Sequence, residues 1–383
     1  MRRQRTGSAI HNLYEMNHIS RIRGIDMDPR IEEHARILVE WSTEVKPGDM
    51  VVINATPDAH ELVVALHKEI AKAGGRVVTL MSSEEALRAY FDGASEETLQ
   101  LVPKHLKAIT ENCDVYIALR SPVNTKALAN VDPKRVLLDS KSQQEIQDIR
   151  LGKRWTLSVH PCQTLAQQAN MSLEEYRDFV YGATLVNWAE ESKMMYVMKE
   201  HLEKHNDVRY IGPKTDLFAS TKGRIWVASI GKHNMPSGEV FTAPVDDSVE
   251  GKIYFDIPFL QLGKVIEGVK LTFEKGKVTD FSAEKEEATL KQIIETDEGS
   301  RRLGEIAIGT NRGIKQYTLN MLFDEKIGDT VHCALGRAYK ECNGVNESAV
   351  HVDMIKSMHK GEIHAGDELI YSKGKYFYER TKK

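Results

Sequence analysis

The apolar residues follow two different patterns along the chain, and the pattern changes near residue 206. Before that point, short apolar runs of strand length alternate with longer segments whose apolar residues recur at helical intervals. After it, strand-like runs follow one another with turn sequences between them. Alternating strands and helices indicate a parallel, helix-covered sheet, whereas successive short strands indicate antiparallel pairing. We therefore expect an α/β N-terminal domain with a mostly parallel sheet and an α+β C-terminal domain with largely antiparallel strands.

The first half contains a β-α-β unit followed by further strands and helices. Asp28-Pro29 is a helix-start signal, and Gly74-Gly75 ends the helix of the β-α-β unit. We expect strands at residues 50–53, 76–80, 115–119, 135–138 and 155–159, and helices at 58–73, 96–109, 143–151 and 172–205, the last broken near Tyr181.

The second half contains strand-like runs and two hairpin turns, Lys275-Gly276-Lys277 and Ser372-Lys373-Gly374-Lys375. We expect strands at residues 224–230, 239–243, 252–257, 269–274 and 278–283, and a helix at 286–295. The boundary is placed in residues 206–214, which contain Gly212-Pro213, so that the domains span residues 27–213 and 214–383. The arginine-rich residues 1–26 have no apolar stretch of signal-peptide length, and we expect them to be an extension outside the fold.

The charge balance and the cysteines limit partners and location. The 383 residues include 52 Lys and Arg and 56 Asp and Glu, a formal net charge of −4, which gives no broad basic surface for nucleic acid. No apolar run reaches the roughly 18 residues of a membrane span. The four cysteines (Cys113, Cys162, Cys333 and Cys342) form no CxxC pair, which favours a reducing, cytoplasmic location. We expect no nucleic acid and no membrane as partners.

Common catalytic and nucleotide-binding motifs are absent from the sequence. There is no GxGxxG, GxxxxGK[ST] or GxSxG, and the loop at residues 54–58 lacks the glycines that let a backbone approach a pyrophosphate. His60-Glu61 begins like HExxH, but Val64 stands where the second histidine is needed. Cys333 follows His332 directly, and sequence neighbours rarely face each other as nucleophile and base.

A better candidate for metal binding is His351-Val352-Asp353. Residues two apart in a strand share a face, so one short strand could supply two metal ligands. A second match, His205-Asn206-Asp207, is interpreted as the end of a helix. Taken singly, Glu239, Glu305 and His332 are each expected to be solvated or structural. Together with the HxD pair, at strand ends of one domain, they are the mixture that a pair of Zn, Co or Mn ions uses.

Four long segments carry a resemblance to a known family. "NMPSGEVFTAP", "IYFDIPFLQLGKVIEGVKLTFEKGKVTDFSAEK", "IIETDEGSRRLGEIAIGTN" and "ESAVHVDMI" resemble the thermophilic metalloaminopeptidases of the aminopeptidase T, S and PepS type. The resemblance runs from about Met27 to the C-terminus. It implies that the C-terminal domain is catalytic, that two divalent metals (Zn, Co, Mn or Mg) are bound there, and that Tyr339 faces the reacting group. The implied metal ligands are Glu239, Glu305, His332, His351 and Asp353.

The resemblance implies a cytosolic, homodimeric aminopeptidase of broad specificity that acts on peptides with a free N-terminus. Carboxylates suit bridging because each offers two oxygens, so Glu305 and Asp353 are the bridging candidates, and Glu305 or another carboxylate is the proton acceptor. Tyr339 would donate a hydrogen bond to the developing oxyanion. Two alternatives stay open: a metal-dependent hydrolase of another amide, and a non-catalytic α/β protein that binds a small molecule.

Overall fold

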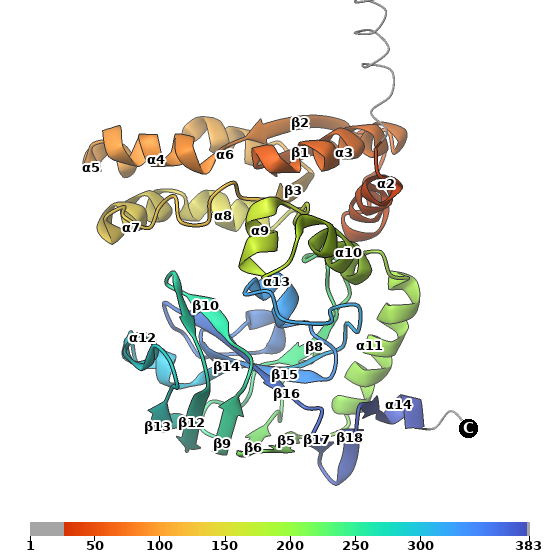
Figure 1. Ribbon diagram of the computed structural model, residues 1–383, viewed down its shortest axis with the longest axis vertical. Coiled ribbons are helices and arrows are strands. Elements are labelled where there is room, and N and C mark those ends of the chain that lie inside the picture. Colours follow the sequence, from red (N-terminus) through yellow and green to blue (C-terminus); the bar gives the residue numbers. More distant parts are fainter. Residues whose placement is uncertain (1–26, 381–383) are drawn as a thin grey trace, which may run out of the picture.

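The computed structural model describes residues 27–380, which form an N-terminal and a C-terminal part (Figure 1). The predicted extension, residues 1–26, lies outside the described residues. The N-terminal part holds a four-stranded sheet, and the C-terminal part holds an eight-stranded sheet, a five-stranded sheet and a two-stranded ribbon. Helix α11 (Trp188–Leu202) runs from the junction along the side of the C-terminal part towards its far end.

The N-terminal sheet is parallel throughout, which confirms the predicted α/β class. Its order is β2-β1-β3-β4, with the buried strands β1 and β3 in the centre. Its strands are β1 (Met50–Ala55), β2 (Arg76–Met81), β3 (Val115–Leu119) and β4 (Arg154–Ser158).

Helices accompany this sheet, and the first begins at the predicted cap. The Asp28 carboxylate accepts a hydrogen bond from the Arg30 N–H at 2.9 Å, which satisfies one of the free donors at the start of α2. The helices are α2 (Pro29–Arg36), the π-helix η1 (Ile37–Ser42), the 3₁₀-helix η2 (Pro57–Ala59), α3 (His60–Lys72), α4 (Glu84–Gly93), α5 (Glu96–Leu99), α6 (Lys104–Glu111), α7 (Pro133–Ser142), α8 (Gln144–Leu151), α9 (Gln163–Gln168) and α10 (Leu173–Thr184).

The strand predicted at residues 135–138 is wrong, because this segment lies inside α7. Asp132 caps that helix by accepting a hydrogen bond from the Lys134 N–H at 2.8 Å, and Pro133 is its first residue. An aspartate followed by proline is the same start signal that predicted the first helix, and here it outweighs the short apolar run that suggested a strand.

One predicted helix and the predicted boundary segment can be compared with the observed elements. The helix expected at residues 96–109 is broken into α5 and α6, with Pro103 directly before α6. The segment at residues 206–214, expected to separate the domains, contains β5 (Asp207–Gly212), which pairs with β6 (Thr215–Ser220) in the eight-stranded sheet. The first strand of the eight-stranded sheet along the chain therefore begins at Asp207, inside the segment in which the domain boundary is predicted.

The pairs within the C-terminal sheets are antiparallel, which confirms the predicted α+β class. The eight-stranded sheet has the order β13-β12-β9-β6-β5-β17-β18-β19, and the five-stranded sheet has the order β16-β15-β14-β8-β7. The remaining elements are β7 (Val227–Ser229), β8 (Glu239–Thr242), β9 (Glu250–Phe255), β10 (Phe259–Gln261), β11 (Lys264–Ile266), β12 (Val269–Glu274), β13 (Lys277–Ser282), α12 (Glu287–Ile294), η3 (Gly299–Arg301), β14 (Leu303–Gly309), α13 (Met321–Asp324), β15 (Thr330–Gly336), η4 (Lys340–Cys342), β16 (His351–Ser357), β17 (Glu362–Ala365), β18 (Glu368–Ser372), β19 (Lys375–Tyr376) and α14 (Phe377–Arg380).

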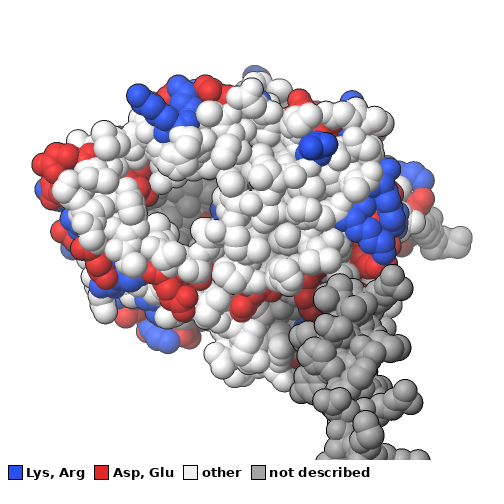
Figure 2. Space-filling model, turned by 90° about the horizontal axis from the view of Figure 1, so that it is seen from above, with Lys and Arg blue, Asp and Glu red and all other residues white. Residues whose placement is uncertain are grey.

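On the face seen from the N-terminal end, the side chains of residues 27–380 form no broad region of one charge (Figure 2). Lys and Arg side chains are interspersed there with Asp and Glu, and the face is hollowed (Figure 2). Among residues 27–380, no helix combines the length and the apolar character that crossing a membrane requires.

Hydrogen bonds of the edge strand β4 connect the two parts. The Leu157 N–H donates to the His233 carbonyl at 2.7 Å, and the Met235 N–H donates to the Leu157 carbonyl at 2.9 Å. The Ser158 hydroxyl donates to the Met235 carbonyl at 2.6 Å. Because the loop at residues 231–238 leads directly into β8, these bonds fix where β8 begins.

The buried side chain of His34 reinforces this connection from α2. Its Nε2 lies 2.9 Å from the Ser158 hydroxyl oxygen. Since Ser158 gives its own proton to Met235, the imidazole must be the donor and must carry its proton on Nε2. Burial lowers the pKa of His34 to about 3, so the ring is neutral at physiological pH.

His34→Gln should reduce the amount by which the free energy of unfolding falls when the pH is lowered. Between pH 6.5, the ordinary histidine value, and pH 3, the unfolded chain binds a proton at this residue that the folded chain does not. The free energy of unfolding therefore falls as the pH falls through this range, by about 2 kcal/mol between pH 6.5 and 5 for one such group. Urea unfolding at pH 7 and pH 5 should show a smaller difference for His34→Gln than for the wild type. The exposed His105→Gln should keep the wild-type difference, and an unchanged difference in His34→Gln would contradict the assignment.

Candidate metal centre

Strand pairing places the five predicted metal ligands on one face of the five-stranded sheet. Directly paired residues in neighbouring strands point to the same side. Glu305 of β14 pairs with Ala334 of β15, which pairs with Asp353 of β16. The other three follow from the same register, in which Gly309 pairs with Glu239, Ala307 pairs with His332, and Gly336 pairs with His351.

Small residues between the ligands leave room for their side chains. Ala307, Gly309, Ala334 and Gly336 lie on the ligand-bearing face, so that no large side chain separates the carboxylates from the imidazoles. A β-bulge between Leu303 and Glu305 aims the Glu305 side chain.

The five side chains form two clusters that share Glu305. One consists of Glu239, Glu305 and His332, and the other of Glu305, His351 and Asp353, with the candidate ligand atoms of each within 4.8 Å of one another. The Nε2 of His332 lies 3.4 Å from Oε1 of Glu305, and the Nε2 of His351 lies 3.2 Å from Oε2. Each oxygen of Glu305 therefore faces a different cluster.

The outer carboxylates complete the two clusters. Oε2 of Glu239 lies 3.5 Å from Nε2 of His332, and Oδ2 of Asp353 lies 3.6 Å from Nε2 of His351. The Nδ1 of His351 lies 2.7 Å from the Arg337 carbonyl, an acceptor, so Nδ1 carries the proton in a neutral ring and Nε2 is free to bind a metal.

Several polar atoms of this centre are buried without a hydrogen-bond partner: Glu239 Oε2, His332 Nδ1 and Asp353 Oδ1. An unsatisfied buried polar atom costs about 1–3 kcal/mol, more when it is charged. Carboxylate oxygens and imidazole nitrogens are the ligands that Zn and related divalent ions take. The residues present therefore fit a metal, which would satisfy the two carboxylate oxygens.

Burial and the opposing charges shift the pKa values in different directions. Burial raises the pKa of Glu239 to about 7 and that of Asp353 to about 6. Glu305 is also buried, but hydrogen bonds from His332 and His351 outweigh this and lower its pKa to about 2. Against the effect of burial, Glu305 raises the pKa of His332 to about 9, and Asp353 with Glu305 raises that of His351 to about 10. A metal has to displace protons from both imidazoles, so its binding strengthens as the pH rises.

Lys326 belongs to the centre and was not predicted from the sequence. Its ammonium group is fully buried, 3.5 Å from Oε1 of Glu239, and it forms an ion pair with Glu325. Glu325-Lys326 lies between β14 and β15 in no motif or periodic pattern, so only the three-dimensional structure reveals it. The lysine compensates part of the negative charge that the three carboxylates concentrate there.

Tyr339 follows β15 and lies beside His351, in the cluster of Glu305, His351 and Asp353. Its ring centre is 5.0 Å from that of His351 and 5.7 Å from that of Phe241, and about 40% of the residue is exposed. The hydroxyl group lies at the buried end of the side chain, and this burial, together with the negative charges of Glu305 and Asp353, raises the pKa of Tyr339. The hydroxyl therefore stays protonated at neutral pH and can donate a hydrogen bond.

A cavity of about 280 Å³ opens onto the two clusters. Both parts of the chain contribute to its wall, because Trp155 of β4 stacks on His233 with ring centres 4.7 Å apart. Carboxylates dominate the charged groups that line it: Glu239, Glu305, Glu325, Glu341 and Asp353, with Lys232 as the lysine of the wall.

Glu239 is held in place by the turn that precedes it. Gly238 has φ of +120°, and a Cβ at this position would lie 2.7 Å from Cβ of Asn311. Asn311 in turn donates through Nδ2 to the carbonyls of Ser237 at 2.8 Å and Ala183 at 3.0 Å. Only glycine combines this backbone conformation with this close approach.

Known proteins resemble the chain over nearly its whole length. The family described as thermophilic metalloprotease (M29) matches residues 27–376. Aminopeptidase 2 of Geobacillus stearothermophilus is 27% identical over 381 residues, covering 86% of this chain and 92% of the relative. Aminopeptidase AmpS of Bacillus subtilis is 28% identical over 383 residues, covering 85% and 92%.

Two solved structures share the fold. Wild-type AmpT from Thermus thermophilus superposes with a TM-score of 0.81 at 24% identity, covering 91% of this chain and 99% of that one. The 2,5-dihydroxypyridine dioxygenase from Pseudomonas putida KT2440 superposes with a TM-score of 0.59 at 16% identity, covering 90% and 96%. At these identities the structural likeness establishes the architecture and not the reaction.

Gly238→Ala should destabilise the protein more than a glycine substitution without a steric conflict. The added methyl group would meet Asn311 in a backbone conformation that alanine rarely adopts, so we expect a loss of more than about 2 kcal/mol in the free energy of unfolding. Gly223→Ala is the matched control, because Gly223 also has positive φ, at +74°, but a Cβ there would meet nothing within 4 Å. Equal losses for the two variants in urea unfolding would contradict a positional role for Gly238.

Proposed function

The chain belongs to the thermophilic metalloprotease (M29) family, and from this membership we propose that it is a metal-dependent aminopeptidase that hydrolyses the N-terminal peptide bond of peptides. The names of its relatives support this activity. The position of Glu305, with one oxygen toward each of two ligand clusters, is the observation that carries the two-metal form of the proposal.

In this proposal Glu239, Glu305 and His332 hold one divalent ion, and Glu305, His351 and Asp353 hold the other. Ions held there would supply Lewis acidity, the chemistry that activates a water molecule and polarises a scissile carbonyl. Glu305 would bridge the two positions, a role supported by its membership of both clusters; Asp353, the other bridging candidate from the sequence, is grouped with Glu305 and His351. The donor set suits Zn, Co or Mn, with Mg as a further candidate.

The remaining steps fall to side chains of the cavity. Tyr339 keeps its proton and donates a hydrogen bond to the oxyanion of the tetrahedral intermediate. The sequence left Glu305 or another carboxylate as proton acceptor. Because both oxygens of Glu305 face a metal position and its pKa is lowered to about 2, we propose that another carboxylate of the cavity, such as Glu325, accepts the proton of the attacking water. The carboxylates of the wall favour a substrate with a free amino group, because they attract a positive charge.

The further properties of the enzyme are proposed from the family resemblance. We propose broad specificity for the N-terminal residue, a homodimer as the working form, and a cytoplasmic location. The four cysteines are free and buried, which agrees with a reducing compartment.

A peptide with a free N-terminus and its N-acetylated form should differ as substrates. Acetylation removes the amino group that the acidic cavity attracts, so we expect kcat/KM to fall by more than about a hundredfold. Release of the shortened peptide, the product that a leucyl peptide and its N-acetylated form share, measures this in the presence of added Zn or Co, and a chelator should abolish it. Equal cleavage of both peptides would favour a hydrolase of another amide, and no metal-stimulated cleavage of either would favour a non-catalytic binding protein.

Substitutions at the two clusters should remove different numbers of ions. Glu239→Ala and Asp353→Ala should each abolish turnover and lower the bound metal by one ion per chain, whereas Glu305→Ala should lower it by two because Glu305 belongs to both clusters. Asp207→Ala, in β5 of the other sheet, should keep both metal and turnover. Elemental analysis of the purified variants provides the count, and a loss of one ion in Glu305→Ala would exclude the bridging role.

A further inference from the structure

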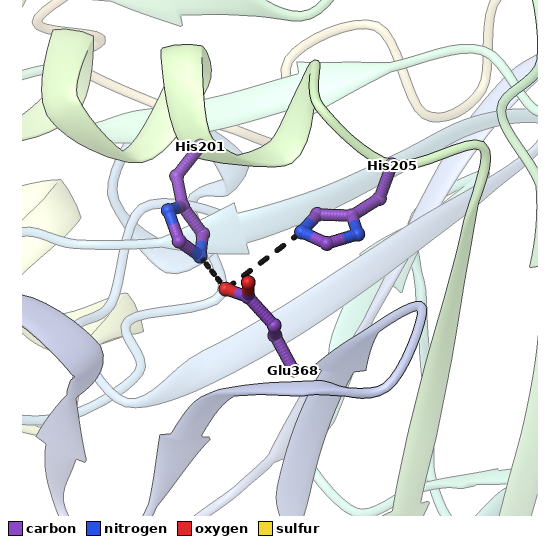
Figure 3. A group of neighbouring side chains, drawn as sticks. All are labelled: His201, His205 and Glu368. Atoms are coloured by element: carbon purple, nitrogen blue, oxygen red, sulfur yellow. Dashed lines mark ion pairs between the residues drawn. The ribbon is translucent and has the colours of Figure 1, made fainter.

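A third cluster of potential metal ligands lies where α11 ends against the β17–β18 hairpin (Figure 3). His201 belongs to the last turn of α11, His205 follows the end of the helix, and Glu368 is the first residue of β18. Both imidazole rings point at the Glu368 carboxylate, and the candidate ligand atoms lie within 4.8 Å of one another. None of these residues lies on the five-stranded sheet that carries the metal centre described above.

The spacing of the histidines suits one shared ion. They are four residues apart, close to one helical turn, and hydrogen bonds from Lys204 to the His201 carbonyl and from His205 to the Leu202 carbonyl continue the turn beyond the helix. The ring centres lie 5.7 Å apart. The sequence pattern His205-Asn206-Asp207 is interpreted as the end of a helix; in the structure the side chains that lie next to His205 are those of His201 and Glu368.

Packing holds both rings in this orientation. The ring of Phe377 stacks on His201, with centres 4.2 Å apart and planes at 21°. Gly366 leaves room for the other ring, because a Cβ at that position would lie 2.9 Å from Nδ1 of His205. The orientation of the two rings is therefore fixed by packing against Phe377 and Gly366 and does not depend on the Glu368 carboxylate alone.

One buried imidazole nitrogen of this cluster has no hydrogen-bond partner. Nε2 of His201 lies 2.5 Å from Oε2 of Glu368, but Nε2 of His205 lies 3.8 Å from the same oxygen, too far for a hydrogen bond. The Nε2 of His205 is buried and has no hydrogen-bond partner. An ion between the three side chains would give this nitrogen a partner, which the carboxylate cannot do while it contacts His201.

We propose that His201, His205 and Glu368 form a separate metal site that binds one Zn²⁺ ion. Two imidazoles and one carboxylate form a donor set typical of zinc, whereas Mg²⁺ and Ca²⁺ prefer oxygen ligands. The Glu368 side chain is 56% exposed, so water has access to the remaining coordination position. The ion fastens the end of α11 to the C-terminal hairpin and stabilises the folded chain, because the unfolded chain does not hold the three ligands together.

Zinc counting on three full-length proteins tests this site. The wild type, His201→Gln/His205→Gln and the control His364→Gln are each freed of metal with a chelator, saturated with Zn²⁺, desalted and analysed for zinc per chain. The control alters a histidine of β17 that lies 3.1 Å from Glu362 but belongs to none of the three-residue ligand clusters among residues 27–380. We expect the double variant to bind one zinc fewer than the wild type and His364→Gln to bind the same number.

The difference between the proteins is independent of how many ions the aminopeptidase centre holds, so this test and those of the proposed function can fail separately. Glu368→Gln alters an exposed side chain and leaves both histidine rings unchanged. We expect this variant also to bind one zinc ion fewer than the wild type, which would confirm the site. Zn²⁺ should also raise the melting temperature of the wild type more than that of either variant. Equal zinc counts in the wild type and the double variant, or the same loss in His364→Gln, would overturn the proposal.

Discussion

The hydrogen bonds between β4 and the loop before β8 are the constraint on which the functional region depends. They make the 231–238 loop an addition to the edge of the N-terminal sheet, so the start of β8, and with it Glu239, is positioned by both parts of the chain. The same contact brings Trp155 against His233 and turns the N-terminal part into a wall of the cavity.

The ligand-bearing sheet has to bury three carboxylates close together, which is costly unless positive charges compensate them. His332, His351 and Lys326 supply such charges. A metal bound to the two imidazoles would have to replace their protons. Lys326 contacts Glu239 through Oε1, while the Oε2 atom faces His332. The lysine therefore contributes positive charge and leaves Oε2 of Glu239, the oxygen that faces His332, available as a metal ligand.

The sequence predicted those parts of the site that depend on local geometry. That His351 and Asp353 share a face follows from the two-residue period of a strand, and the helix start at Asp28-Pro29 follows from capping. The register that brings Glu305 opposite Asp353 through Ala334 is set by strand pairing between segments far apart in the sequence, and no local pattern encodes it. Residue types at the expected strand ends suggested that these side chains belong together, and the family resemblance, not the spacing along the chain, identified them as ligands of two metals. Lys326 and the β4 contact could not be predicted for the same reason, whereas the error at residues 135–138 was avoidable, because Asp132-Pro133 repeats a signal already recognised upstream.

Two solved structures that share this fold, AmpT from Thermus thermophilus and the 2,5-dihydroxypyridine dioxygenase from Pseudomonas putida KT2440, are named for different enzymes, so the architecture does not select the reaction. What the sheet provides is a rigid face on which carboxylates and imidazoles can be placed at chosen positions. The number of clusters, the sharing of Glu305 between them and the acidic wall around them are properties of individual side chains. The cluster at the end of α11 illustrates the same principle on a different element: one helical turn places two imidazoles together, and a neighbouring strand supplies the carboxylate. In both places the metal-binding potential depends on whether the surrounding hydrogen bonds leave ligand atoms unused, as they do at Glu239, Asp353 and His205.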